Sequence, residues 1–149
     1  MKFKQISPID NIAELILDIS NIKLNISGGW GYDSNCPVIV NDLDIPNEQF
    51  FNLFASLRAN IEMNMTLDEN DRYAGINLTL KEQKNIKNYT VVTFKISAIK
   101  ESKYAQFIKE YKDGYGKKDF DLAAHFNNRK KHTLNIESDY WFILQAQSL

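Results

Sequence analysis

Hydrophobic residues recur every three or four positions in three segments of the chain, and this spacing predicts three amphipathic helices. The first covers residues 8–21, with Ser7 placed to cap it and Pro8 in its first turn. The second covers residues 46–57, and the third covers residues 101–112. One face of each helix is expected to pack against the core.

Apolar and polar residues alternate in the middle of the chain. This pattern predicts strands over residues 61–67, 73–80 and 89–99, because successive side chains on a strand point to opposite faces of the sheet. Polar turns at residues 68–71 and within residues 81–88 separate these strands. Strands joined by such short turns pair antiparallel, since a parallel pair needs a crossover of about a dozen residues or more. We therefore expect an antiparallel β-meander at the centre of the fold.

Shorter patterns complete the chain up to residue 131. The apolar run over residues 37–40 predicts a buried strand that follows the first helix. Residues 115–118 form a glycine-containing loop after the third helix. Asp119 is placed to cap a short helical turn over residues 120–123.

The C-terminal segment is predicted to form a hairpin. Residues 132–136 alternate, residues 140–144 are an aromatic run, and the polar residues 137–139 lie between them. A helix over residues 139–147 is the alternative. Together the elements predict an α+β fold, an antiparallel β-meander with helices packed on one face.

Composition favours one soluble domain. The chain has 149 residues, of which 44% are hydrophobic and 25% are charged, so we expect residues 1–149 to form a single domain. Eighteen basic and nineteen acidic residues give a net charge of −1. No overall positive field attracts nucleic acid or an anionic membrane, and we expect neither as a partner.

The cysteine content and the N-terminus indicate the compartment. Cys36 is the only cysteine, which excludes an internal disulfide and a metal site built from several thiolates. Asp10 and Glu14 interrupt the segment where a secretory signal needs an apolar core, and no apolar run approaches the roughly 18 to 20 residues of a membrane span. These features predict a cytoplasmic protein.

Residues capable of catalysis do not share a recognisable spacing. Cys36 needs a basic partner to act as a nucleophile, and the sequence places neither His125 nor His132 beside it. The glycines of residues 28–31 lack the Lys-Ser/Thr of a phosphate-binding loop, and no carboxylate completes a metal-ligand spacing around the histidines. We expect no catalysis, no metal and no cofactor, with His125 on the surface or in a loop and His132 at a strand end.

Charged clusters fall in predicted turns. Asp42 and Asp44 follow a strand, residues 68–71 form an acidic turn, and such carboxylates are normally solvated turn-formers. The run Arg129-Lys130-Lys131 is the only local concentration of positive charge, and cations beside a strand commonly guard a sheet edge. Contact with nucleic-acid phosphates through this run is the alternative. Separated patches of opposite sign favour a charged protein partner.

The segment Gly28-Gly29-Trp30-Gly31-Tyr32-Asp33 is the most distinctive in the chain. Three glycines in four residues permit backbone conformations that other residues disfavour, which predicts a shaped loop. Trp30 and Tyr32 either fasten this loop onto the core or present their rings to a partner. Fastening has the stronger general basis, because loops that tie a helix to a sheet commonly bury such rings.

Part of the chain resembles a known group of proteins. The amphipathic helix, Ile26-Ser27-Gly28-Gly29-Trp30-Gly31-Tyr32-Asp33 and Pro37-Val38-Ile39-Val40 together look like the N-terminal portion of some bacterial immunity proteins of polymorphic toxin and contact-dependent growth inhibition systems. The resemblance covers about a quarter of the chain. It implies a small cytoplasmic protein that binds a cognate toxin domain and blocks it without catalysis. Immunity proteins diverge widely in fold and interface, so the resemblance carries over no binding residue.

Two functions are consistent with these features. The first is a protein-binding inhibitor, which uses loop residues for contact. Its candidate contact residues are Trp30, Tyr32, Asp33 and Tyr115. The second is a small-ligand-binding domain or small enzyme with a pocket between the helices and the sheet. The candidate polar lining of that pocket is Tyr32, Asp33 and either His125 or His132.

Overall fold

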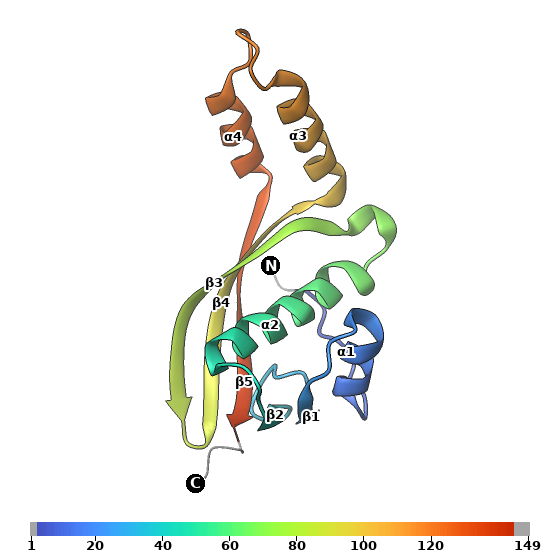
Figure 1. The fold of residues 1–149 in the computed structure, drawn as a ribbon, viewed down its shortest axis with the longest axis vertical. Helices are drawn as coiled ribbons and strands as arrows, with labels where there is room; N and C mark the ends of the chain where they lie inside the picture. Colours follow the sequence, from blue (N-terminus) through green and yellow to red (C-terminus); the bar gives the residue numbers. More distant parts are fainter. Residues whose placement is uncertain (1–2, 145–149) are drawn as a thin grey trace.

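The structure is a computed structural model that describes residues 3–144. Within these residues, four α-helices and a five-stranded mixed sheet form a single α+β domain, which confirms the predicted fold class (Figure 1). The helices are α1 (Ile12–Ser20), α2 (Asn47–Asn60), α3 (Glu101–Gly114) and α4 (Leu122–Lys131). The strands are β1 (Asn25–Gly28), β2 (Val38–Asp42), β3 (Tyr73–Ile86), β4 (Tyr89–Lys100) and β5 (Thr133–Leu144). Two short helical turns, η1 (Ile61–Met65) and η2 (Glu69–Asp71), lie between α2 and β3.

The sheet has the strand order β1-β2-β5-β4-β3. Its strands pair antiparallel except for β2 and β5, which run parallel through residues 38–40 and 142–144. An antiparallel meander is therefore present as β3-β4-β5. Its third strand comes from the end of the chain, and the predicted first strand over residues 61–67 does not belong to it.

Residues 61–67 are a correction to the predicted secondary structure. Residues 61–65 prolong α2 as the π-helical turn η1, in which Ile61, Glu62 and Met63 are all buried, and residues 66–67 leave the helix in a turn. Three consecutive buried residues do not fit a half-buried strand, whose neighbours point to opposite faces. No glycine or proline follows Pro46 until Gly75, so α2 meets no strong stop signal and the helical path continues.

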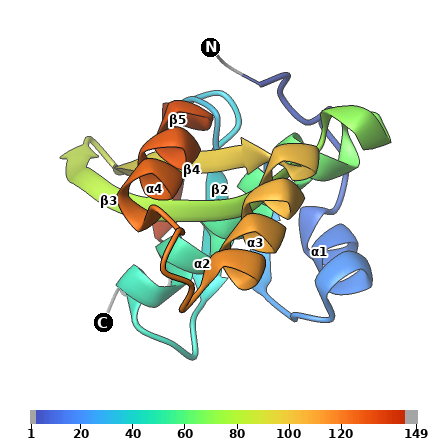
Figure 2. The same ribbon diagram turned by 90° about the horizontal axis from the view of Figure 1, so that it is seen from above.

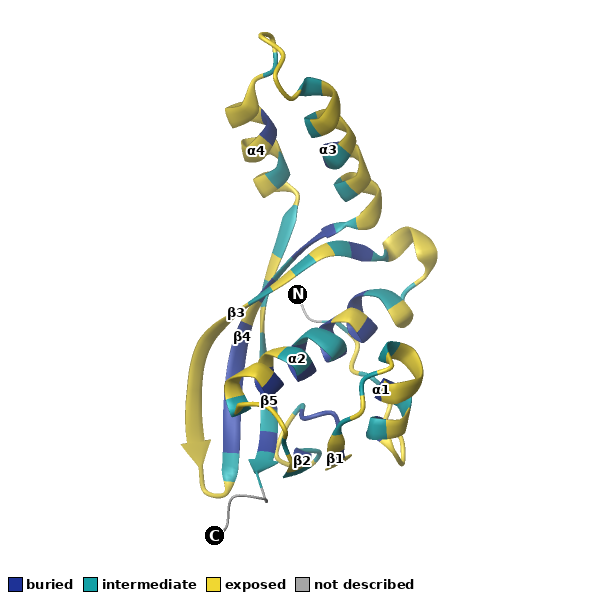
Figure 3. Ribbon diagram, viewed as in Figure 1, coloured by how far each residue is buried: buried dark blue, intermediate teal, exposed yellow. Residues whose placement is uncertain are grey.

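The reversal predicted within residues 81–88 is shorter than expected. β3 continues to Ile86, and only Lys87 and Asn88 make the turn, with Lys87 in the left-handed conformation at φ 56°. The polar sequence is tolerated here because this half of β3 is an exposed edge strand (Figure 3). A bulge between Leu80 and Glu82 interrupts its register, a feature that protects sheet edges from unwanted pairing.

The predicted C-terminal hairpin is also wrong, because residues 133–144 form one continuous strand, β5. The alternative helix is excluded over residues 139–144, and its last residues lie outside the described part of the chain. Glu137 and Asp139 suggested a turn, but Glu137 forms an ion pair with Lys81 and Asp139 accepts a hydrogen bond from Thr93. Partners on other strands therefore accommodate these two carboxylates within a continuous strand.

Side-chain caps mark the N-terminal ends of α1 and α4. Asn11 caps α1 in place of Ser7, since its side-chain oxygen accepts a hydrogen bond from the backbone N–H of Glu14 at 3.1 Å. In the same way Asp121, and not Asp119, caps α4 by accepting from Ala124 at 3.0 Å. α4 is consequently a full helix over residues 122–131 where a short turn was expected.

The main core lies between α2 and one face of the sheet. Phe50, Phe51 and Phe54 of α2 pack around Phe142 of β5, with ring centroids 4.7 to 5.7 Å from it. Alternate residues of β4 face the same layer: Val92, Phe94, Ile96 and Ala98. Such clustered aromatic burial contributes strongly to the stability of the fold.

The hairpin formed by α3 and α4 lies outside this layer. It is inserted between β4 and β5. The two helices lie next to each other in both views, and Figure 1 shows them beyond the end of the sheet (Figures 1 and 2). Most of its residues are exposed, whereas the middle of β4 is buried (Figure 3). The expectation that the helices pack on one face is therefore not confirmed.

Candidate functional site

The glycine–aromatic loop, residues 28–36, closes part of the free edge of β5. β2 pairs with β5 only through residues 142–144, and the next backbone N–H, that of Trp141, donates to the carbonyl of Gly31 at 2.8 Å. Gly31 has a left-handed φ of 83°, and a β-carbon there would lie 3.0 Å from the carbonyl oxygen of Trp141. Glycine is required because the loop backbone approaches the strand so closely.

The structure places Trp30 in the core. Its side chain is 2% exposed and packs against Phe54 of α2, with the two ring centroids 6.3 Å apart. The ring therefore has the fastening role, and Trp30 is not among the surface residues available to a partner. The burial of this ring opposes the mobility that three glycines allow the loop.

Arg58 of α2 joins the loop to β5 from inside the protein. Its side chain is 0% exposed. One terminal nitrogen donates to the carbonyl of Trp30 at 3.2 Å, and the other donates to the hydroxyl of Ser138 at 2.7 Å and the carbonyl of Asp139 at 3.0 Å. The two carbonyls lie outside the pairing of β2 with β5, so Arg58 satisfies backbone groups that this pairing leaves open.

Two tyrosine rings enclose the same guanidinium group. Its central carbon lies 4.2 Å from the ring centroid of Tyr32 and 3.7 Å from that of Tyr140. Cation–π contacts of this kind strengthen when water is excluded. Glu62, one helical turn further along, provides the counter-charge at 3.7 Å from the Nε of Arg58.

Tyr32 and Glu62 extend this network toward the N-terminal segment. The Tyr32 hydroxyl donates to a carboxylate oxygen of Glu62 at 2.6 Å and accepts from the backbone N–H of Ile6 at 2.9 Å. Burial raises the pKa of the Glu62 carboxyl above its ordinary value, and the opposing effects of Arg58 and of the Tyr32 hydrogen bond are smaller. Burial likewise raises the pKa of Tyr32, which stays neutral at physiological pH.

A polar cleft of about 270 Å³ opens beside this network. The described residues that line it come from the N-terminal segment, the glycine–aromatic loop, α2 with η1, and the strands β4 and β5: Phe3, Gln5, Tyr32, Arg58, Glu62, Thr93, Ile136, Glu137, Ser138 and Asp139. A carboxyl with a raised pKa is able to exchange a proton there. No histidine, cysteine or lysine is among these lining residues, whose polar side chains are hydroxyls, carboxyls, one amide and the Arg58 guanidinium.

The other predicted pocket residues do not reach the cleft. Asp33 is exposed, and its carboxylate accepts from the backbone N–H of Asn35 at 2.8 Å, which shapes the loop. Cys36 lies 3.6 Å from the same carboxylate. His125 and His132 belong to the projecting hairpin and its junction with β5, so the structure does not bring them to Tyr32.

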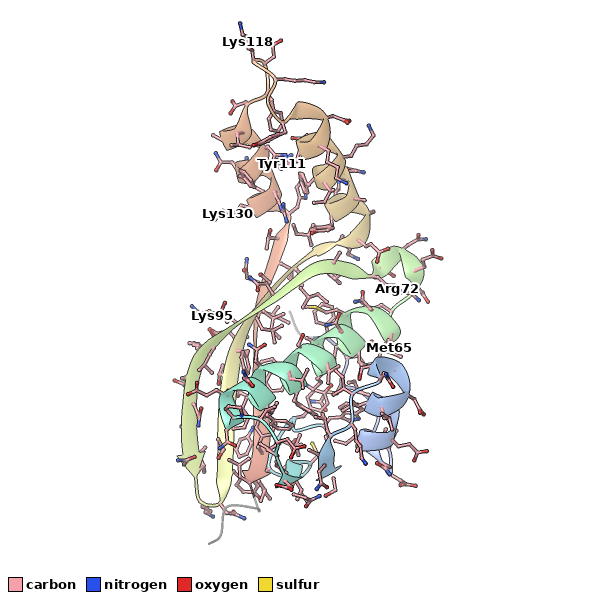
Figure 4. The ribbon with its side chains drawn as sticks, viewed as in Figure 1. Met65, Arg72, Lys95, Tyr111, Lys118 and Lys130 are labelled. Atoms are coloured by element: carbon pink, nitrogen blue, oxygen red, sulfur yellow. The ribbon has the colours of Figure 1, made fainter. Side chains whose placement is uncertain are left out.

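His125 is buried, contrary to the expectation of a surface or loop position. It is 2% exposed, and its Nδ1 lies 2.9 Å from a carboxylate oxygen of Glu110. Four rings surround it at centroid distances of 5.1 to 5.9 Å: Phe107, Tyr111, Phe120 and Phe126. The imidazole is the centre of a small core that α3 and α4 share, and Figure 4 shows Tyr111 between the two helices. His132 is exposed at the start of β5, as expected.

The hairpin exposes large apolar side chains. Tyr115 at its tip is 71% exposed, and Leu122 and Phe126, one turn apart on α4, are 46% and 48% exposed. Basic residues accompany them, with Lys118 at the tip and Lys130 on α4 (Figure 4). We name Tyr115, Leu122 and Phe126 the hairpin surface. Its position on a projecting element makes it the best candidate for contact with another molecule.

Sequence reasoning identified Tyr32 and Tyr115 but missed most of both sites. Arg58 and Glu62 have the (i, i+4) spacing of a helical ion pair, and the predicted strand over residues 61–67 concealed that relation. Leu122 and Phe126 have the same spacing, which the predicted short turn concealed. The basic run Arg129-Lys130-Lys131 occupies the last turn of α4, where the helix dipole favours cations, and does not guard a strand edge.

Comparisons with protein-family models, with curated proteins and with solved structures find no match to this chain. Over residues 3–144, no group of three or more His, Cys, Asp or Glu side chains is arranged to hold a metal ion. In the same part of the chain, no helix has both the length and the apolar character of a membrane span.

Proposed function

We propose that this protein is a non-catalytic, protein-binding inhibitor that contacts a cognate bacterial toxin domain through the hairpin surface. The observation that carries the proposal is the exposure of Tyr115, Leu122 and Phe126 on an element that projects from the body. Exposed aromatic and aliphatic side chains gain free energy when a partner removes them from water, and tyrosine is common among energetically dominant contact residues.

The identity of the partner class comes from the resemblance of the N-terminal segment to bacterial immunity proteins. In this chain the resembling loop serves the body of the protein, since Trp30 and Gly31 are used to close the edge of β5. The proposal therefore places the contact at the hairpin and leaves the loop to support the fold. Tyr115 keeps its proposed contact role, while Tyr32 is committed to Glu62 and Arg58.

A second candidate function rests on the polar cleft. Its volume of about 270 Å³ and the buried carboxyl of Glu62 suit a small polar ligand. This candidate is weaker because Tyr32, Glu62 and Arg58 already bond to one another, so a ligand must replace protein contacts.

The test is capture of the partner from native cell lysate with the tagged full chain, followed by native mass spectrometry. We expect a complex of one chain with one partner protein whose toxicity, when it is expressed alone in a bacterial host, is suppressed by co-expression of this chain. The double variant Leu122→Ser with Phe126→Ser should lose both capture and protection. The matched control, Leu80→Ser with Ile86→Ser, removes apolar side chains of similar exposure from β3 and should retain both.

Circular dichroism and thermal unfolding of each variant must show that the fold is kept, because Phe126 also contacts Tyr111 and His125. Equal capture by both double variants would place the contact elsewhere. Recovery of the free chain alone, at low and moderate salt, would refute the protein-binding function and favour the polar cleft.

A further inference from the structure

A groove of about 680 Å³ lies at the end of the molecule opposite the hairpin (Figure 1). Its walls are the segment that leads from α1 into β1 and the segment that leads from β2 into α2. The described residues that line it are Ile22, Lys23, Leu24, Asn25, Asp42, Leu43, Asp44, Ile45 and Leu53. None of these residues takes part in the Arg58 network or the hairpin surface.

The floor of the groove is apolar and only partly covered. Ile22, Leu24, Leu43 and Leu53 are half-buried, and Ile45 is 36% exposed. Five aliphatic residues that meet in one concavity form a larger continuous apolar surface than isolated exposed residues do. β1 beside the groove is also the edge strand of the sheet, and within the described residues its outer edge pairs with no strand.

The rim of the groove is acidic. Asp42 and Asp44 are exposed, and Lys23 is the one basic residue of the lining. The N-terminal half of the sequence, which supplies all the lining residues, has the same sign: residues 1–71 contain four basic and eleven acidic residues, a net charge of −7. Residues 72–149 contain fourteen basic and eight acidic residues, a net charge of +6. The small overall charge therefore conceals a strongly acidic N-terminal half.

We infer that this groove binds a basic segment of another protein, with aliphatic side chains of the segment on the apolar floor and its Lys or Arg side chains beside Asp42 and Asp44. Opposite charges draw the segment to the rim, and burial of the floor supplies the affinity. The acidic rim repels nucleic-acid phosphates and anionic lipid headgroups, so the charge selects a protein over both. The inference does not depend on the hairpin surface or on its partner.

The probe is a short fluorescein-labelled peptide of alternating Lys and Leu, titrated with the full chain and followed by fluorescence anisotropy. A peptide with Glu in place of Lys is the charge control. We expect binding of the Lys peptide only, weakening as salt is raised. The double variant Asp42→Asn with Asp44→Asn should weaken that binding by about tenfold, because it removes the charges of the rim.

The matched control is Asp68→Asn with Glu69→Gln, which makes the same change in net charge at exposed residues outside the groove. It should leave the affinity within about twofold of the wild-type value. Ile45→Ser should weaken binding without changing any charge, whereas Ile86→Ser on β3 should not. The hairpin variant Leu122→Ser with Phe126→Ser should bind the Lys peptide as the wild type does, whatever its effect on partner capture.

Four results would overturn the inference. Equal loss of affinity in the two carboxylate variants would mean general charge attraction without a site. Equal binding of the Glu peptide would mean that the acidic rim does not select the ligand. No effect of Ile45→Ser would mean that the apolar floor does not contribute to binding. Light scattering that shows a dimer at low salt, converted to monomer by Asp42→Asn with Asp44→Asn, would assign the groove to the basic hairpin of a second copy.

Discussion

Arg58 is the residue on which the interior most depends. It is a fully buried cation that holds two segments distant in sequence, the glycine–aromatic loop at Trp30 and β5 at Ser138 and Asp139. A buried ion pair contributes little over an apolar replacement when both partners are exchanged together, but loss of one partner leaves the other charge desolvated. Glu62 would be that remaining charge.

Replacement of Arg58 by methionine should therefore lower the free energy of unfolding by about 3–5 kcal/mol. Methionine keeps much of the apolar stem, so the loss reports the missing hydrogen bonds and charge. Urea unfolding followed by tryptophan fluorescence and by circular dichroism measures it. Arg72→Met is the control at a partly exposed arginine near η2 (Figure 4), and a loss below about 1 kcal/mol is expected there. Similar losses of unfolding free energy in the two variants would show that the buried contacts of Arg58 do not stabilise the fold more than an ordinary surface arginine does.

Glu62 gives a pH dependence with a defined sign. Its pKa is raised by burial, so the folded protein holds the proton more tightly than the unfolded chain does. The stabilisation from that proton is fully present below the ordinary pKa of the carboxyl and is lost as pH rises through the folded pKa. The glutamine variant Glu62→Gln has no such titration.

The free energy of unfolding of the wild type minus that of Glu62→Gln should consequently fall as pH rises from the mildly acidic range to neutrality. Urea unfolding of both proteins at matched pH values measures this difference, in which the titrations common to both proteins cancel. A difference that grows with pH would show that the Arg58 ion pair outweighs burial and lowers the pKa. A difference independent of pH would mean that Glu62 titrates alike in the folded and unfolded states.

At the scale of elements, the prediction was correct for the helices and the strand whose apolar residues follow one clear period. Apolar spacing located α1, α2 and α3, and strict alternation located β4. The prediction failed where a contact with a residue distant in sequence determines the local conformation. Glu137 and Asp139 look like turn residues until Lys81 and Thr93 are brought across from other strands.

The candidate sites were less predictable than the elements for the same reason. The loop at Gly31 was recognised from its composition. The carbonyl of Gly31, however, accepts a hydrogen bond from the backbone of Trp141, more than one hundred positions later in the chain, and no local pattern indicates that pairing. Arg58 gave no sequence signal of burial, because charged residues on a helix are normally exposed. The hairpin surface could not be predicted because a short turn capped by Asp119 was expected in place of α4. The structure shows a complete helix capped by Asp121, on which Leu122 and Phe126 lie one turn apart.

The hairpin of α3 and α4 should open more readily than the rest of the fold. Phe107 and His125 are the buried residues of its two helices, whereas α2 alone buries six. Elements with few buried apolar contacts unfold locally at lower free energy. In native-state hydrogen exchange, the amides of α3 and α4 should exchange at least about tenfold faster than those of α2, after correction for intrinsic rates. Equal protection would show that the hairpin unfolds only with the whole domain.

At the scale of the whole molecule, two candidate contact regions of opposite charge lie at opposite ends. Residues 101–132, which contain α3 and α4, carry eight basic and five acidic residues, while the remainder of the chain carries ten basic and fourteen acidic residues. The protein is therefore an electric dipole despite its net charge of −1, and a charged partner meets it in a preferred orientation.

The topology allows the two ends to be separated experimentally. β4 and β5 pair continuously up to Ile99 and Thr133, so the whole hairpin is inserted where a tight turn would suffice. Replacement of residues 101–131 by Asn-Gly should connect the strands through a two-residue turn and leave the body folded, because that dipeptide favours the turn geometry that matches strand twist. Circular dichroism and cooperative urea unfolding test the fold of this shortened chain.

The shortened chain should then divide the two binding activities. It lacks the hairpin surface and should fail to capture the toxin-like partner, yet it keeps Asp42, Asp44 and the apolar floor and should bind the Lys–Leu peptide with wild-type affinity. Loss of both activities from a correctly folded body would mean that the ends act together on one partner. Retention of partner capture would transfer the contact from the hairpin to the body, where the acidic groove is the next surface to test.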